Sequence, residues 1–251
     1  MAPVLYYERV ELPIGKKDEA PQSGAAGGLN SMRDETASAA PAGANEEIFN
    51  WGAVAMHARE AEAVNVKRAP VTAAVVDSGV EDTHPDREGR VDTSRSVKCS
   101  VNGVATQDFY GWRDDYFHGT HVAGSIAAKH DGVGADGVNP TLRIAAINVA
   151  SRNGGFFYPE YIVCGFVWAA EHGISVTNGS YYVDPWKYWL PNDPEQAAGQ
   201  EAVQRAVDYA TLKDVINVVA AGNFSTDLDN LPTTDDSAPG GPSRGEKAVP
   251  C

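Results

Sequence analysis

Short, almost entirely apolar runs recur along this chain, and segments long enough to form a helix separate them. The run 71–76 ends at Asp77, and the run 142–149 repeats the pattern. Because such a run offers no polar face to solvent, it is typical of a parallel strand that is covered on both sides. Strands that alternate with helices predict an α/β fold with a doubly wound, mostly parallel sheet. The other predicted strands are 174–177 and 215–221, and the predicted helices are 118–129, 159–172 and 194–213. Residues 47–64 suit a helix or helical turns.

The composition divides the chain into a leader and a domain. Residues 1–45 are rich in Ala, Gly, Pro, Ser and charged side chains, and such a segment buries too little surface to offset the entropy of ordering. We therefore expect a flexible leader or linker there, followed by one domain over 46–251. Trp51 and Met56 are the expected apolar anchors of the first helix. Residues 224–251 are rich in turn-forming side chains and are expected to form a loop-like tail.

The charge and the apolar content exclude several classes of partner. The net charge of −14 argues against binding to nucleic acid or to an anionic membrane surface, because both carry negative charge. No apolar run approaches the roughly 20 residues that span a bilayer, and residues 1–15 lack the pattern of a signal peptide. The chain has three cysteines, Cys99, Cys164 and Cys251, so at least one is expected to be unpaired, and the redox compartment stays undetermined.

Polar residues with catalytic chemistry stand at the ends of predicted strands or at a helix start. Asp77 ends the run 71–76, His118 opens the helix 118–129, and Asn223 follows the run 215–221. In an open parallel sheet, functional groups gather at the carboxyl ends of the strands. Taken singly, each residue fits a turn, a cap or a structural role, and we read His121 as structural. The three in this order favour a shared site.

Three sequence blocks carry a family resemblance. AAVVDSGVEDTHPD around Asp77, HGTHVAGSIAA from His118 and VVAAGN up to Asn223 resemble successive signature blocks of the subtilases, the subtilisin-like serine peptidases, in order and in spacing. The resemblance covers about residues 51–223. It implies a subtilisin-like three-layer α/β sandwich, of which this chain would hold the N-terminal two-thirds, with the C-terminal part missing.

The resemblance also implies a role for each residue. Asp77 would orient the imidazole of His118, which would act as general base and then as general acid in a serine endopeptidase that works by acyl transfer. Asn223 would donate its side-chain amide to the oxyanion. The segment VTNGSYYVDPW stands where the family has its cleft strand, so Gly179 and Ser180 would bind the substrate backbone. We expect a monomer that acts on a peptide or protein substrate. The resemblance implies an extracellular location for the intact enzyme, and the location of this chain stays open.

The serine nucleophile is the part of the pattern that this sequence does not supply. The family places it after the Asn, in a Gly-Thr-Ser block at the start of a helix, and no such block occurs here. Ser243 lies between Pro and Arg without an apolar helix after it, Ser180 matches the cleft strand, and Ser78 reads as a turn. We therefore expect the chain to lack the nucleophile and to be inactive alone.

Two explanations for the missing serine stay open. The chain is either a fragment of a longer active enzyme or a degenerate homologue, and the retention of Asp77, His118 and Asn223 favours the fragment. The rival functions are a non-catalytic module that binds an extended peptide by β-augmentation and a truncated product without a function of its own.

Three weaker features complete the sequence. Asp86 and Asp131 match positions where some subtilases bind calcium, but two acids fall far short of six to eight ligands, so we favour turn carboxylates and expect no required metal or cofactor. The sequons at Asn178 and Asn223 lie in predicted cleft segments, and we reject them as glycosylation sites. An aromatic cluster either lines a substrate groove or forms a surface insertion; its members are Tyr181, Tyr182, Trp186, Tyr188 and Trp189.

Overall fold

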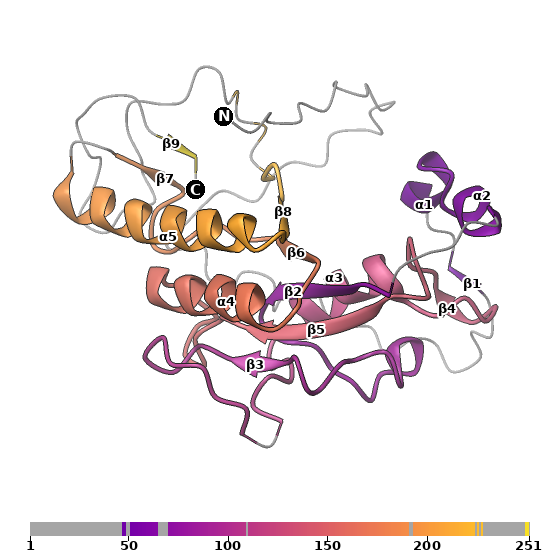
Figure 1. Cartoon of the computed structure of the whole chain (residues 1–251). Helices are drawn as coiled ribbons and strands as arrows, with labels where there is room; N and C mark the ends of the chain where they lie inside the picture. The colour runs from indigo at the N-terminus through magenta and orange to yellow at the C-terminus, as the bar shows by residue number, and fades with distance from the viewer. Residues whose placement is uncertain are drawn as a thin grey trace.

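The computed structural model describes residues 47–48, 51–64, 70–108, 110–190, 193–223, 225, 227 and 249–250 (Figure 1). The helices in this part of the chain are α1 (Trp51–Ala55), α2 (Ala58–Ala63), the 3₁₀-helix η2 (Pro85–Arg87), α3 (His118–Ala127), α4 (Pro159–Glu171) and α5 (Pro194–Leu212). The strands are β1 (Glu47–Ile48), β2 (Thr72–Asp77), β3 (Val97–Lys98), β4 (Gly134–Ala135), β5 (Arg143–Asn148), β6 (Val176–Gly179), β7 (Tyr188–Trp189), β8 (Ile216–Val219) and β9 (Val249–Pro250). None of the helices in the described ranges combines the length and the apolar character of a membrane span.

One parallel sheet of five strands organises the domain, in the order β3-β5-β2-β6-β8. The crossovers from β2 to β5 and from β5 to β6 each contain a helix, as a parallel connection requires. The register places Asp77 opposite Asn148, and Val76 opposite Gly179. This arrangement confirms the predicted α/β fold with a doubly wound parallel sheet, and it brings the carboxyl ends of the strands to one edge.

The side chains of the central strand β2 alternate between two cores, which makes the domain three layers thick. Ala74 and Val76 face the core that α4 and α5 cover, whereas Ala73 and Val75 face the core that α3 covers. Figure 1 shows α4 and α5 running side by side over the sheet. All six residues of β2 are buried, as the apolar run predicts.

The N-terminal part of the domain corrects one prediction. Two short helices form the predicted helical turns, but they begin at Trp51, because Glu47 and Ile48 form β1 and pair with β4. Trp51 and Met56 are exposed and do not anchor this segment. Helices as short as α1 and α2 have little stability of their own, so their packing depends on contacts with the rest of the domain. The apolar residues of the segment alone therefore did not predict which side chains are buried. The leader 1–45 and most of the tail 224–251 lie outside the described residues.

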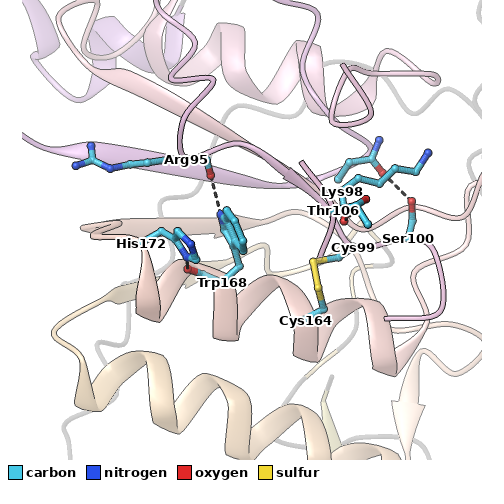
Figure 2. Close-up of a disulfide and its surroundings, with 9 residues drawn as sticks. Arg95, Lys98, Cys99, Ser100, Thr106, Cys164, Trp168 and His172 are labelled. Carbon is cyan, nitrogen blue, oxygen red and sulfur yellow. Dashed lines mark hydrogen bonds between the residues drawn. A yellow bond between two sulfur atoms is a disulfide. The ribbon is translucent and has the colours of Figure 1, made fainter. Parts of the chain in front are cut away.

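A disulfide joins Cys99, just after β3, to Cys164 on α4, with the two Cα atoms 5.8 Å apart (Figure 2). The expectation that at least one cysteine is unpaired therefore rests on Cys251, which lies outside the described residues. A second contact ties the same two elements, since the indole N–H of Trp168 donates to the carbonyl oxygen of Arg95 at 2.8 Å. The edge strand β3 is thus fastened to the helical layer.

Candidate active site

Asp77 and His118 meet at the carboxyl edge of the sheet. The distance from Asp77 Oδ1 to His118 Nδ1 is 2.8 Å, which is a hydrogen bond. Asp77 is the last residue of β2 and His118 is the first residue of α3, so the pair joins the central strand to the helix that covers one face. This bond leaves Nε2 as the imidazole nitrogen that can exchange a proton with a reacting group.

The carboxylate of Asp77 is completely buried. Besides His118, its Oδ1 atom accepts a hydrogen bond of 2.7 Å from the backbone N–H of Ser78. The other carboxylate oxygen, Oδ2, is buried and has no hydrogen-bond donor in the described part of the chain. A buried carboxylate with one unpartnered oxygen is costly to keep charged, so the bond to His118 carries much of its stabilisation.

Two side chains from outside the helix hold the N-terminus of α3. Phe117, the residue before the helix, has a left-handed backbone with φ of 67° and caps nothing with its side chain. The free N–H of Gly119 instead donates to Ser78 Oγ at 2.9 Å, and the N–H of Thr120 donates to Asp114 Oδ2 at 2.8 Å. Ser78 Oγ in turn donates to Asp114 Oδ1 at 2.8 Å. These bonds satisfy N–H groups that have no partner within the helix. They fix the start of α3 and therefore the position of His118.

Gly119 allows the helix to approach the strand closely enough for the hydrogen bond. A Cβ atom at this position would lie 2.2 Å from the carbonyl oxygen of Gly79 and 3.1 Å from Cβ of Asp77. Gly79 itself has φ of +111°, a conformation that side chains rarely adopt. The glycines of the two sequence blocks are therefore needed for the geometry of the Asp77–His118 pair.

The electrostatics of the pair raise the pKa of the imidazole. The hydrogen bond to Asp77 raises the pKa of His118 above its ordinary value, burial opposes this, and the charges of Asp77 and Asp114 add to it. Burial raises the pKa of Asp77, while the hydrogen bond from His118 lowers it. The side chain of His118 is 19% exposed, so the imidazole is open to a reacting group on its other side.

Asn223 is not hydrogen-bonded to this pair in the described structure. It follows β8, it is exposed, and no hydrogen bond links it to Asp77 or His118. The backbone N–H of Ala220 donates to Gly179 O at 3.0 Å, which continues the pairing of β8 with β6 beyond the strand end. Asn223 therefore follows the carboxyl end of the same sheet. His121, one turn further along α3, is also exposed.

The segment after β6 contains the other predicted binding residues. Gly179 ends β6, and Ser180 Oγ accepts a hydrogen bond of 2.8 Å from Asn178 Nδ2. The ring of Tyr181 stacks on Phe157 with centroids 4.6 Å apart. Burial, together with the charge of Asp77, raises the pKa of the Tyr181 phenol.

Three members of the aromatic cluster belong to the core or pack against it. Trp189 is almost completely buried, and Tyr181 and Trp186 pack against the core that α4 and α5 cover. Asp184, in the same segment, accepts a hydrogen bond of 2.7 Å from the N–H of Phe157. This bond ties the segment after β6 to the loop after β5.

Two residues that support the site have no motif around them. Asp114 lies four residues before His118 and holds the start of α3, and Asn148 lies opposite Asp77 in the neighbouring strand. Asn148 could have been noticed in the sequence because it is a polar residue near the end of the otherwise apolar run 142–149.

The carboxylates considered for calcium have other hydrogen bonds. Asp86 Oδ2 accepts from the N–H of Ala135 at 3.3 Å, and Asp131 Oδ1 accepts from the N–H of Val133 at 3.2 Å. Within the described ranges, no group of three or more His, Cys, Asp or Glu side chains could hold a metal ion.

A parallel sheet with an Asp–His pair at the carboxyl ends of its strands defines an α/β protein of the serine-peptidase type. Comparison with known proteins supplies the family. The model of the Subtilase family matches residues 69–246, and the chain belongs to this family of serine peptidases.

Curated relatives and solved structures agree with this assignment. Fervidolysin from Fervidobacterium pennivorans is 34% identical over 190 residues, which are 72% of this chain and 25% of fervidolysin. Subtilisin E from Bacillus subtilis (strain 168) is 32% identical over 171 residues, which are 68% of this chain and 38% of subtilisin E. The chain thus spans between a quarter and two-fifths of the length of these two relatives.

Two crystal structures are similar in fold. The epidermin leader peptide processing serine protease from Staphylococcus aureus has a TM-score of 0.55 at 26% identity, over 65% of this chain and 40% of that protein. The nisin leader peptidase from Lactococcus lactis has a TM-score of 0.57 at 23% identity, over 68% of this chain and 49% of that protein. At the latter identity the likeness concerns the fold alone.

Proposed function

We propose that this chain carries the proton-transfer half of a subtilase active site, with His118 as general base and general acid and Asp77 as the group that orients it. The observation that carries the proposal is the hydrogen bond of 2.8 Å between His118 Nδ1 and the buried carboxylate of Asp77. The carboxylate holds the proton on Nδ1, so Nε2 is free to take a proton from a nucleophile and return it to a leaving amine.

We further propose that the serine nucleophile is not among the residues of this chain, which would then be unable to form an acyl-enzyme alone. Two candidate hydroxyls are already engaged, which supports this. Ser78 Oγ donates to Asp114 and accepts from the N–H of Gly119, and Ser78 is buried. Ser180 Oγ accepts from Asn178. Ser243, the third candidate, lies outside the described residues.

The proposed substrate is an extended peptide, because that is what an endopeptidase of this family would cleave. Gly179 and Ser180 would bind its backbone, and Asn223 would donate to the oxyanion. Their place after β6 and β8, at the edge of the sheet where Asp77 ends β2, supports these roles. We keep an extracellular location as part of the proposal, and the disulfide supports it, because disulfides persist in oxidising compartments.

The test combines a chemical probe with a titration. Fluorophosphonate labelling demands an activated serine, so we expect the 251-residue chain to remain unlabelled while subtilisin E is labelled under the same conditions. In an NMR titration of the chain, we expect the pKa of His118 to lie above the ordinary value of about 6.5, and to fall in Asp77→Asn.

The two results have separate consequences. Labelling of this chain would overturn the proposal that it lacks the serine. A His118 whose pKa is not raised, or does not respond to Asp77→Asn, would overturn the proposed role of the pair.

A further inference from the structure

The side chain of Asn148 joins the two segments that carry the Asp77–His118 pair. Asn148 is the last residue of β5 and is buried. Its amide nitrogen Nδ2 donates to the carbonyl oxygen of Ser78 at 2.8 Å and to that of Arg113 at 3.1 Å. Ser78 directly follows Asp77, and Arg113 begins the stretch that leads into His118. One amide group therefore links the segment that follows β2 to the segment that precedes α3.

The side-chain oxygen and the backbone oxygen of Asn148 accept hydrogen bonds from the segment after β3. Its side-chain oxygen accepts a hydrogen bond of 3.3 Å from Ser100 Oγ, and its backbone oxygen accepts one of 2.8 Å from the N–H of Cys99. Cys99 is cross-linked to Cys164 on α4, and Figure 2 shows Ser100 next to this cross-link. Asn148 is thus held by the segment after β3 as well as by its pairing with β2.

The two carbonyl groups that Asn148 bonds constrain the pair directly. The carbonyl oxygen of Ser78 lies in the peptide group that joins Ser78 to Gly79, and the N–H of Ser78 donates to the Asp77 carboxylate at 2.7 Å. A shift of Ser78 therefore displaces a donor to that carboxylate. Residue 113 adjoins Asp114, whose carboxylate receives the N–H of Thr120 in the first turn of α3. A buried carbonyl that loses its donor carries a penalty comparable to a lost hydrogen bond, and both segments would rearrange to relieve it.

We propose that Asn148 is a positioning residue of the active site, which sets the distance between the Asp77 carboxylate and the His118 imidazole by donating to both flanking segments. It touches neither reacting group and acts through the backbone alone. This inference rests on the proposed function of the pair and names the residue that holds its geometry.

The test is the titration of His118 in the folded 251-residue chain. Asn148→Leu keeps a similar volume and removes both donated hydrogen bonds. We expect the pKa of His118 to fall by about half a unit or more, and the downfield signal of its Nδ1 proton to broaden or disappear. The charged groups that act on this imidazole are the carboxylates of Asp77 and Asp114, and the substitution changes neither charge.

Three further variants separate positioning from a general loss of stability. Asn148→Ser is the milder change, for use where Asn148→Leu does not fold, and it should lower the pKa of His118 in the same direction. Ser100→Ala removes only the bond to the amide oxygen and should give a smaller fall. Asn153→Ala removes an exposed amide in the loop after β5 and should leave His118 unchanged.

The outcomes distinguish this inference from the proposed function. If wild-type His118 has no raised pKa, the pair itself fails. If the wild-type pKa is raised but both folded Asn148 variants keep that value and the downfield proton, Asn148 has a structural role only and the inference is overturned.

Discussion

The two edges of the five-stranded sheet are covered very differently. At the β3 edge, both strand residues, Val97 and Lys98, are buried. The chain then folds back, since Lys98 and Thr106 form an antiparallel bridge, and the disulfide from Cys99 fastens this segment to α4. At the β8 edge, Ile216 and Val219 are 66% and 65% exposed.

This difference separates the site into a rigid part and an open part. An edge strand with exposed apolar side chains is a template for another strand, and native sheets usually cover it. Within the described ranges, β8 pairs with β6 alone. Asp77 ends β2, the middle strand of the sheet, so its geometry is protected from both edges, whereas Asn223 follows the uncovered one.

Removal of the disulfide should have the largest effect. The bond joins residues 65 positions apart, and a loop of that length corresponds to about 4 kcal/mol of stabilisation through the entropy of the unfolded chain. We expect the double variant Cys99→Ser and Cys164→Ser to lose about this much in urea denaturation. Cys251→Ser is the matched control, because it keeps the pair. A loss of less than about 1 kcal/mol would show that the cross-link does not close the β3 edge.

Truncation of a core side chain should come next and should contrast with the same change on β8. Ile147 on β5 is completely buried, whereas Ile216 on β8 is mostly exposed. We expect Ile147→Ala to lower the free energy of unfolding by about 3 kcal/mol, and Ile216→Ala by about 0.5 kcal/mol or less. Equal losses for the two variants would mean that the β8 edge is covered in solution.

A pH dependence should show how far the protected region extends towards β8. Burial raises the pKa of Asp184, in the segment after β6, to about 6 from the ordinary 3.8. Because the folded state binds this proton more tightly, its contribution to stability is full below pH 3.8 and is lost as the pH rises through about 6. We expect Asp184→Asn, which can still accept the bond from Phe157, to be about 3 kcal/mol more stable than wild type at pH 8 and similar to it at pH 4.

Urea denaturation at the two pH values measures this effect. The exposed Asp131→Asn is the control, which should track the wild type at both values. If Asp184→Asn has the same pH dependence as the wild type, the carboxyl group does not titrate with folding, and the segment after β6 is looser than described.

The smallest change in stability is expected from a charge on the open edge. Val218→Lys places a charged side chain on β8, where strands are commonly protected from association in this way. We expect the free energy of unfolding to change by less than about 0.5 kcal/mol, and analytical ultracentrifugation at high concentration to show no more self-association than in the wild type. A strongly destabilised Val218→Lys would indicate that this edge is buried.

The central strands and the start of α3 could be predicted from the sequence, because each is marked by a pattern of neighbouring residues. The run ending at Asp77 is apolar throughout and is buried throughout, and the helix predicted from His118 begins there. The helical turns predicted from residue 47 begin only at Trp51, because the pairing of Glu47 with Gly134 depends on a partner far along the chain.

The supporting residues of the site could not be predicted for the same reason. Nothing in the sequence pairs Cys99 with Cys164, or directs the amide of Asn148 to the carbonyl groups of Ser78 and Arg113. Such contacts follow from the tertiary fold and leave no periodic pattern. The motif residues are visible in a sequence, whereas the residues that hold them in place are found only in three dimensions.

The requirement for glycine at position 119 gives a simple criterion for sorting homologous sequences in genome surveys. A methyl group there would collide with the backbone at Gly79, so a homologue with alanine at this position must hold its helix further from the strand. Such a homologue can retain both the aspartate and the histidine and still be unable to join them. Surveys that separate active peptidases from inactive homologues should therefore score this glycine together with the catalytic residues.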